Sequence, residues 1–192
     1  MHKYLPKFYI FLDQYNTKIF KNNSTNIGII YRNYKAKKRE TELVKIAKAC
    51  KKKRYPLFVS NDSKLAIKTG ADGLYIPAFN KTKKLYNTEN KKFIIIGSAH
   101  NQKEIKEKIS QKCKVIFLSP IFNVKKSKKF LDIHKFNFLT LANKANFLAL
   151  GGLHLGNLKK LKLLNVKGFG GIKIFKKKPA YERPVFLKNN FF

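Results

Sequence analysis

Eight short, fully apolar runs recur along the chain, and they constrain its fold more than any other feature. They lie at residues 8–12, 27–31, 56–60, 73–76, 93–97, 115–119, 147–150 and 168–172. Runs that are apolar throughout, rather than at alternate positions, are typical of parallel strands buried on both faces of a sheet. The sequence therefore predicts eight buried strands.

Helix patterns separate several of these runs. In three segments the apolar residues fall on one helical face: Leu43, Ile46, Ala47 and Cys50 in 39–53, Ile105 and Ile109 in 101–112, and Leu158, Leu161 and Leu164 in 156–165. Eight strands alternating with helices predict a (β/α)8 TIM barrel, formed by residues 1–192 as one small domain, with abbreviated first, fourth and last helices. A doubly wound open sheet is the alternative, but it calls for a glycine-rich loop after the first strand, and "FLDQYNTKIF" contains no glycine.

The charge is strongly positive, with 43 Lys and Arg against 10 Asp and Glu and a net charge of +33. Such a field attracts phosphate-bearing partners, so a nucleic-acid-binding protein is one hypothesis. The other is a compositional bias, because the lysines spread over nearly every expected helix and loop. Arginine, the better residue for base edges, occurs only at Arg32, Arg39, Arg54 and Arg183. This distribution favours a general cationic coat.

The sequence also bears on the compartment. Cys50 and Cys113 are too few for a disulfide framework and lack metal-type spacing, so we expect buried, reduced thiols. The apolar run before Asp13 has no small-residue cleavage site, which argues against a signal peptide. No stretch approaches the roughly 20 apolar residues of a membrane span. We therefore expect a cytoplasmic protein with no membrane partner.

In a barrel, the reactive residues follow the carboxyl ends of the strands. These positions offer cations, hydroxyls and bare backbone amides, with one or two carboxylates, which suits a phosphorylated ligand with a magnesium ion. In chain order they are Asp13, Arg32, Asn33, Asn61, Asp62, Ser98, His100, Ser119, Asn123, Lys125 to Lys129, Gly151, Gly152, Gly170 and Gly171.

The segment "ALGGLHLGNLKK" places two glycines between an expected strand and the start of a helix. Backbone N–H groups of such a turn can close on a phosphate. A tight turn that needs glycine for steric reasons alone is the other interpretation.

Four segments carry a family resemblance. "SNDSKLAIKTGADGLYIP" resembles the "NDxxxLAxxxGADGVHLGQ" segment of the thiamine-phosphate synthase and TenI (thiazole tautomerase) family, and "IIGSAHNQKEI" resembles its "IGxSxHxxxE". "VIFLSPIFNVKKSKK" is similar to "YxxxGPIFxTxTK", and "FLALGGLHLGNLKKLKLLNVKGFGGIKIF" to the family's glycine-rich final segment. All four occur in the family's order over roughly residues 8–178, and the fold that they imply is the same barrel.

The resemblance implies a reaction. Synthases of this family join an aminopyrimidine methyl diphosphate to a thiazole phosphate and release pyrophosphate with Mg²⁺, in thiamine biosynthesis. Arg32 matches an arginine that would hold pyrophosphate, Asn61 and Asp62 match an Asn–Asp pair with Asp62 as magnesium ligand, and Ser98 matches a serine facing the diphosphate or pyrimidine. The backbones of Gly151, Gly152, Gly170 and Gly171 would hold the thiazole phosphate.

The chain also departs from the family pattern. The family's "QLREK" segment contains the arginine that Arg32 matches, but its lysine falls on Tyr34, with Lys35 adjacent. Lys126 stands where the family's "YxxxGPIFxTxTK" segment has a hydroxyl side chain. Asn80 follows the fourth strand, where the second magnesium aspartate is expected. The catalytic histidine of the TenI branch falls on Pro120.

These departures leave three hypotheses open. The first is a synthase-like transferase, and the second is a TenI-like paralogue that binds thiazole or thiamine phosphate. The third is a basic nucleic-acid-binding protein. The resemblance also implies a possible homo-oligomer, and it makes His100 a loop-packing residue rather than a catalyst and Asp72 a structural residue of the GADG corner.

Overall fold

The computed structural model describes residues 5–22, 26–34, 38–82, 93–125 and 129–175. Its eight strands form a closed, all-parallel barrel in chain order, in which β1 pairs with both β2 and β8. The strands are β1 (Phe8–Leu12), β2 (Ile27–Tyr31), β3 (Leu57–Ser60), β4 (Gly73–Ile76), β5 (Ile94–Ala99), β6 (Val115–Leu118), β7 (Phe147–Leu150) and β8 (Phe169–Gly171). The predicted TIM barrel is confirmed, and each strand falls on one of the eight apolar runs.

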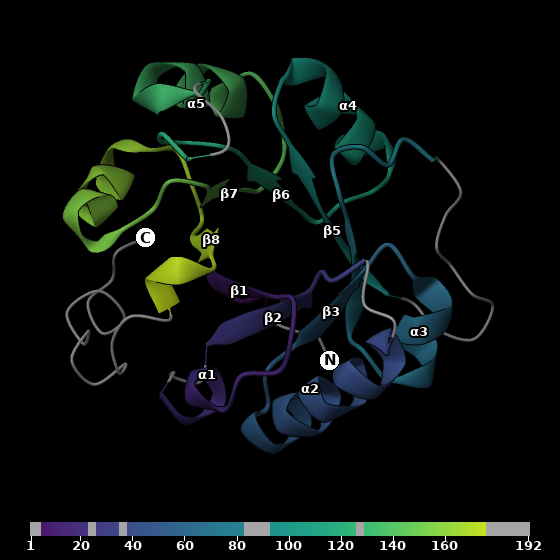
Figure 1. The fold of residues 1–192 in the computed structure, drawn as a ribbon. Helices are drawn as coiled ribbons and strands as arrows, with labels where there is room; N and C mark the ends of the chain where they lie inside the picture. The colour runs from purple at the N-terminus through teal and green to yellow at the C-terminus, as the bar shows by residue number, and fades with distance from the viewer. Residues whose placement is uncertain (1–4, 23–25, 35–37, 83–92, 126–128, 176–192) are drawn as a thin grey trace.

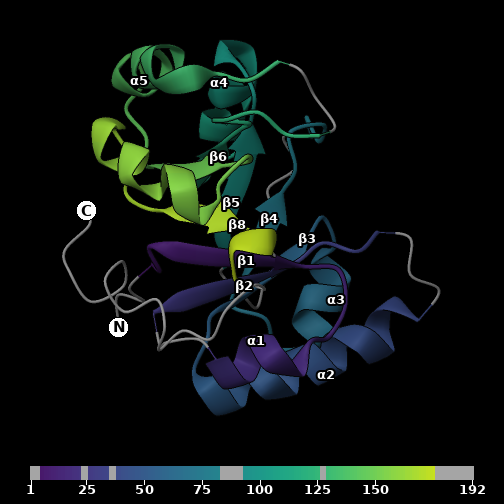
Figure 2. The same cartoon turned by 60° about the vertical axis from the view of Figure 1, so that its left-hand side comes forward.

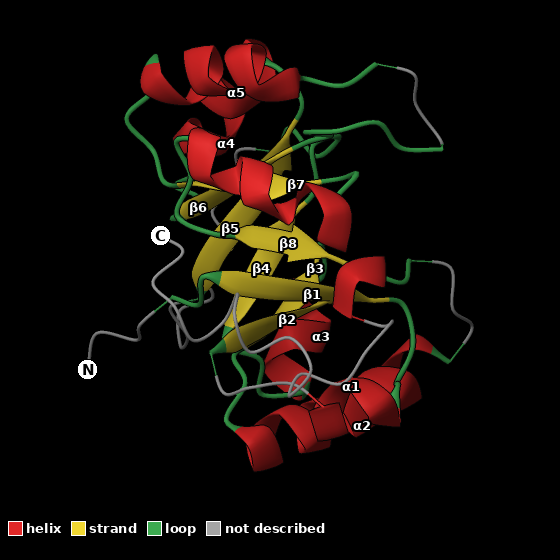
Figure 3. Ribbon diagram, turned by 90° about the vertical axis from the view of Figure 1, so that its left-hand side faces the viewer, coloured by secondary structure: helices red, strands yellow, loops and turns green. Residues whose placement is uncertain are grey.

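The helices cover the barrel from two sides (Figures 1 and 3). They are α1 (Thr17–Asn22), α2 (Arg39–Lys53), α3 (Ser63–Lys68), α4 (Gln102–Ser110) and α5 (Asp132–Leu141), with 3₁₀ helices η1 (Leu155–Leu163) and η2 (Lys173–Phe175). In Figure 2, α1 and α2 lie side by side next to β1 and β2, with α3 beside them. The first helix is short, as predicted. The expected fourth and last helices fall mostly or wholly outside the described residues.

Aromatic side chains fill the barrel interior. Tyr9 and Phe11 of β1 meet Phe117 of β6 in edge-to-face contacts at 5.2 and 5.4 Å between ring centroids, and Tyr75 packs against Phe11 at 5.4 Å. Such pairs add roughly 0.5–1.5 kcal/mol beyond the area that they bury. The interior is therefore a packed core, and a substrate can approach only its ends.

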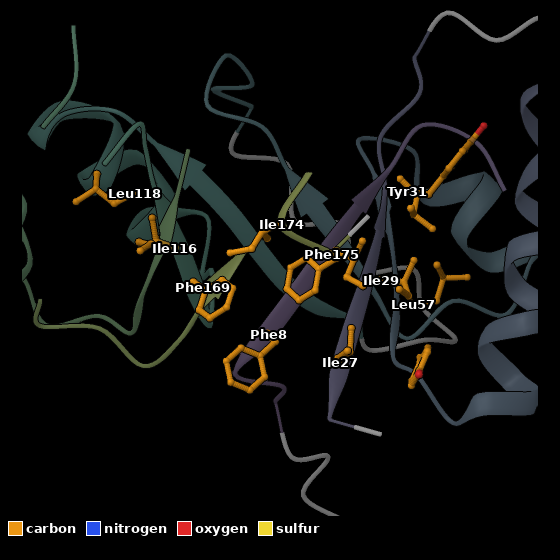
Figure 4. Close-up of a cluster of buried hydrophobic side chains, with 14 of the residues drawn as sticks. Phe8, Ile27, Ile29, Tyr31, Leu57, Ile116, Leu118, Phe169, Ile174 and Phe175 are labelled. Atoms are coloured by element: carbon orange, nitrogen blue, oxygen red, sulfur yellow. The ribbon is translucent and has the colours of Figure 1, made fainter. Parts of the chain in front are cut away.

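A second apolar layer lies between the barrel and its helices. Figure 4 shows part of it, where Phe8, Phe169 and Phe175 gather around the β1–β8 seam. The Phe8 and Phe169 rings lie 5.0 Å apart, and the Phe169 and Phe175 rings stack at 5.8 Å. Alternate residues of each strand face this layer and the interior, which is why the strands had to be apolar throughout.

The helices follow their sequence patterns with three differences. Ile105 of α4 is buried as expected, but Ile109 is 40% exposed. Residues 155–163 form a 3₁₀ helix, and the leucine spacing of three suits its three residues per turn. Helix α5 had no clear amphipathic signal, because Phe136 and Leu139 are buried while Phe138 and Leu141 of the same helix are exposed.

Two further expectations concern the thiols and membranes. Cys50 is buried and Cys113 is half-buried, both are free, and burial raises the pKa of each thiol. The raised pKa makes both thiols poor nucleophiles, and Cys113 is less buried than the sequence predicts. None of the helices that the structure describes is long and apolar enough to cross a lipid bilayer.

Candidate functional site

Because the strands are parallel, the residues that follow them meet at one end of the barrel. Arg32 lies directly after β2, Asn61 and Asp62 follow β3, and Ser98 lies near the end of β5. The predicted site residues of β2, β3 and β5 are thus brought to the same rim.

Arg32 is held at this rim by two contacts. Its Nε lies 3.6 Å from Oδ1 of Asp13, and its guanidinium lies over the Phe11 ring, 5.5 Å from the centroid. The side chain is 35% exposed, so it is open to an anion from solvent. Asn33 donates a hydrogen bond to the Asp13 carbonyl at 2.9 Å, which ties the ends of β1 and β2 together.

Asn61 occupies a left-handed backbone conformation, with a φ of 56°. Asparagine tolerates this region better than most residues. Its side-chain oxygen accepts a hydrogen bond from the amide nitrogen of Asn80, the residue at the position expected for a second aspartate. The ends of β3 and β4 are therefore joined by two neutral amides.

Asp62 makes contacts with both of its oxygens. Oδ1 accepts the Leu65 N–H at 2.9 Å and caps α3, while Oδ2 accepts from Nη1 of Arg39 at 2.8 Å. Nη2 of Arg39 donates to the Ser60 carbonyl at 2.7 Å. Sequence reasoning did not find Arg39, which is 23 residues away; its place at the start of the second helix was the only available signal.

Tyr34 is a second residue that sequence reasoning missed. Its hydroxyl lies 2.6 Å from Oγ of Ser60, and its ring packs against Phe79 at 5.9 Å. Partial burial raises the pKa of Tyr34, although the hydrogen bond to Ser60 acts in the opposite direction. Tyr34 is therefore a neutral hydroxyl at the rim.

Ser98 is almost completely buried and bonds to the Tyr75 hydroxyl inside the barrel. Burial raises the pKa of Tyr75, and the bond to Ser98 partly offsets that effect. The serine thus lies beneath the rim, at the floor of the site.

Gly151 and Gly152 have positive φ angles of 89° and 73°. A Cβ on Gly151 would lie 2.8 Å from Cβ of Pro120, and one on Gly152 would lie 2.5 Å from the Phe122 carbonyl oxygen. The two glycines therefore have a steric reason to be glycine, namely the close approach of the loop that follows β6. A phosphate-binding role for their amides stays a prediction.

Gly170 and Gly171 lie in β8, with Gly170 facing the interior. A Cβ there would lie 2.8 Å from the Phe117 ring and 3.0 Å from the Phe11 ring. Gly170 thus makes room for the aromatic core, and its amide, like that of Gly171, stays a predicted phosphate ligand. Lys35 and Lys126 lie outside the described residues. Lys125 and Lys129, which lie on either side of Lys126 in the sequence, are described and exposed.

The remaining polar residues have structural contacts. The His100 ring nitrogen Nδ1 lies 2.9 Å from Glu104 in the first turn of α4, and the exposed side chain packs less closely than the expected loop-packing residue. Oδ2 of Asp72 accepts the Leu57 N–H at 2.9 Å, which confirms its structural role in the GADG corner.

These contacts bear on whether the site can hold a magnesium ion. Across the described parts of the chain, no group of three or more His, Cys, Asp and Glu side chains is placed to hold a metal ion. Asp62 is the carboxylate that the sequence singled out, and a guanidinium and a helix N–H already use its two oxygens. The arrangement does not fit a magnesium ion held by two carboxylates, and the metal role of Asp62 stays a prediction.

Comparison with known proteins gives consistent findings. The family model of thiamine monophosphate synthase matches residues 19–174. The thiamine-phosphate synthase of Prochlorococcus marinus strain AS9601 is 32% identical over 130 residues, which cover 63% of this chain and 35% of that protein. The synthase of a second Prochlorococcus marinus strain is 26% identical over 133 residues, covering 66% and 37%. The chain thus spans about a third of the length of the curated relatives that it matches.

Solved structures share the fold at low identity. Thiamine phosphate pyrophosphorylase from Pyrococcus furiosus superposes with a TM-score of 0.73 at 14% identity, covering 93% of this chain and 91% of that one. KGPDC from Streptococcus mutans gives 0.64 at 14% identity, covering 93% of both chains. These two likenesses establish the barrel and nothing finer. The family model, by contrast, spans most of the barrel, and the chain belongs to the thiamine monophosphate synthase family.

Proposed function

We propose that this chain is a thiamine-phosphate-synthase-like transferase. It would join an aminopyrimidine methyl diphosphate to a thiazole phosphate, giving thiamine phosphate and pyrophosphate. The observation that carries the proposal is the rim at the carboxyl ends of β2, β3 and β5, which bears Arg32, the Asn61–Asp62 pair and the buried Ser98. Family membership supports the same substrate class.

The chemistry depends on stabilising a leaving group. The bond between the pyrimidine methyl carbon and the diphosphate oxygen breaks, the electron pair leaves with pyrophosphate, and the thiazole ring nitrogen supplies the pair for the new bond to that carbon. Fixed donors aimed at that developing charge lower the barrier, and removal of one such donor costs about 10²–10³ in kcat. We assign this work to Arg32, with Asn61 and Ser98 positioning the pyrimidine diphosphate, and with Lys35 and Lys126 as further cations.

The thiazole phosphate is assigned to the other side of the rim. Gly151 and Gly152 carry no side chains of their own over their backbone amides, and Gly170 and Gly171 end the neighbouring strand. The family generally uses Mg²⁺, and Asp62 is the ligand that the sequence offers. Its present contacts argue against a metal ion held as in the family, and no step here depends on one.

The test is pyrophosphate release from both precursors, measured for the wild type, Arg32→Gln and Arg54→Gln. Arg54 ends α2 as an exposed arginine and serves as the matched control. We expect release from the wild type and the control, and a loss of about 10²-fold or more in Arg32→Gln. Absence of release from the wild type, with thiazole phosphate still bound, would favour the TenI-like alternative.

Steeply salt-dependent binding of RNA, without preference for thiazole phosphate, would instead favour the hypothesis of a nucleic-acid-binding protein.

The cellular location and the oligomeric state are further parts of this proposal. The cytoplasm is the proposed location, because two cysteines are too few for the disulfide framework of a small secreted protein. A homo-oligomer is proposed only by analogy with the family.

A further inference from the structure

Arg39 lies against Asp62, the carboxylate expected to bind magnesium. We propose that Arg39 is the built-in cation of this site, and that the chain binds the diphosphate group of its substrate without a divalent metal ion. This inference depends on the proposed function, because it concerns the diphosphate of that substrate.

Arg39 is fixed in place by several elements. Its Nη1 lies 2.8 Å from Oδ2 of Asp62 and its Nη2 lies 2.7 Å from the Ser60 carbonyl oxygen. Its guanidinium lies 5.7 Å from the centroid of the Tyr31 ring and 6.0 Å from that of Tyr34. The first helical residue of α2 is thereby joined to the ends of β2 and β3.

The same contacts leave little room for a magnesium ion. Mg²⁺ requires near-ideal octahedral geometry and oxygen ligands, usually one or two carboxylates with phosphate and water. Oδ2 of Asp62 faces a guanidinium, and Oδ1 accepts the Leu65 N–H. A dication beside Oδ2 would also be repelled by the positive charge of Arg39.

The second carboxylate of a magnesium site is absent as well. Asn80 stands at that position, and its amide nitrogen donates to Asn61. A neutral amide contributes no charge to a metal ion. Of the two positions at which the family pattern has magnesium aspartates, only that of Asp62 keeps a carboxylate, and Arg39 already neutralises its charge.

Arg39 keeps the capacity to act on an anion. A guanidinium carries five N–H donors and stays protonated at all relevant pH values. The contacts to Asp62 and Ser60 account for one donor on each terminal nitrogen, and Nε is buried without a hydrogen-bond partner in the described structure. Arg32, which follows β2, is a second arginine at the rim. The rim therefore holds two permanent cations whose positive charge requires no metal ion.

The experiment is calorimetric titration of inorganic pyrophosphate into the whole chain, once in EDTA and once in excess Mg²⁺. We expect the wild-type affinity to change by less than about threefold between the two conditions. Arg39→Gln should bind at least about tenfold more weakly in EDTA, because a charge-assisted contact and the neutraliser of Asp62 are both lost. Arg54→Gln is the control and should match the wild type.

Mg²⁺ should restore affinity to Arg39→Gln, because the substitution frees Oδ2 of Asp62. If Arg39 only held α2 against Asp62, Mg²⁺ would not restore the affinity of Arg39→Gln for pyrophosphate. Mn²⁺ titration followed by electron paramagnetic resonance provides a second readout, with weak binding in the wild type and tighter binding in Arg39→Gln. If Arg39→Gln fails to fold, the two wild-type titrations still test whether pyrophosphate binding needs a metal ion. Arg39→Lys then tests whether the guanidinium is required.

Each outcome has a distinct meaning. Wild-type binding that disappears in EDTA overturns the metal-free inference and leaves the proposed function standing. Equal affinities for the wild type and Arg39→Gln in EDTA overturn the role of Arg39. Wild-type protein that binds no pyrophosphate in either condition contradicts the proposed function, and the inference fails with it.

Discussion

Gly152→Ala tests whether the turn after β7 is set by packing. Gly152 has a φ of 73°, and a Cβ there would lie 2.5 Å from the Phe122 carbonyl oxygen. Left-handed backbone costs an L-residue about 1–2 kcal/mol. Displacement of the Phe122 backbone adds about 1–3 kcal/mol, as overpacking does elsewhere. The sum is about 2–5 kcal/mol, or about 4–20 °C in Tm for a chain of this size.

Gly70→Ala provides the matched control for this substitution. Gly70 also has a positive φ, 67°, but a Cβ there would meet no atom within 4 Å. Both variants stiffen the unfolded chain equally, so the difference between them isolates the overlap with Phe122. Urea unfolding followed by circular dichroism should place Gly152→Ala below Gly70→Ala by about 1–3 kcal/mol.

Equal stabilities of the two variants would refute this reasoning. In that case the turn has room for a side chain, and its glycines would need another explanation, with phosphate binding by their amides the first candidate. The comparison therefore separates the steric interpretation of "GGLHLGN" from the functional one.

Two smaller predictions concern individual contacts. Asn101→Ala should destabilise the chain by about 1 kcal/mol, because the N-cap bond to the Glu104 N–H at 3.0 Å is lost, whereas Asn101→Asp should match the wild type in urea unfolding. Lys108 is fully buried, and burial lowers its pKa, so the unfolded chain binds the proton more tightly. Lys108 therefore contributes stability that rises with pH towards about 10.4, the ordinary lysine value, while the raised pKa values of the Cys50 and Cys113 thiols act in the opposite direction. The difference in unfolding free energy between the wild type and Lys108→Met should therefore grow with pH across that range, because the variant keeps the thiols and lacks only the lysine. A variant with the same pH slope as the wild type would contradict the assignment to Lys108.

The barrel could be predicted from the sequence because its signals are local. A strand buried on both faces must be apolar at every position, so eight runs of four or five residues marked eight strands within about two residues. The cap at Asn101 was equally local, because its side chain bonds only three residues away. Helix α5 was less clear, because Phe138 and Leu141 are apolar yet exposed.

The site was less predictable because its contacts join distant parts of the chain. The pair of Arg39 with Asp62 spans 23 residues, and that of Tyr34 with Ser60 spans 26. Resemblance to a family identified Asp62 as a functional position. Only the register of α2 against β3 shows that an arginine lies against it.

The charge of the chain can now be divided into two parts. The net charge of +33 is carried almost wholly by lysine, which is spread over the outer helices and loops in the manner of a compositional bias. Arginine is scarce, yet two of the three described arginines, Arg32 and Arg39, lie at the rim, each beside an aspartate. A bias towards lysine does not explain this placement. The chemistry of arginine does, because the N–H donors of its planar guanidinium match the geometry of carboxylate and phosphate groups. We therefore propose that the few arginines at the rim carry more of the functional signal in the charge than most of the lysines do.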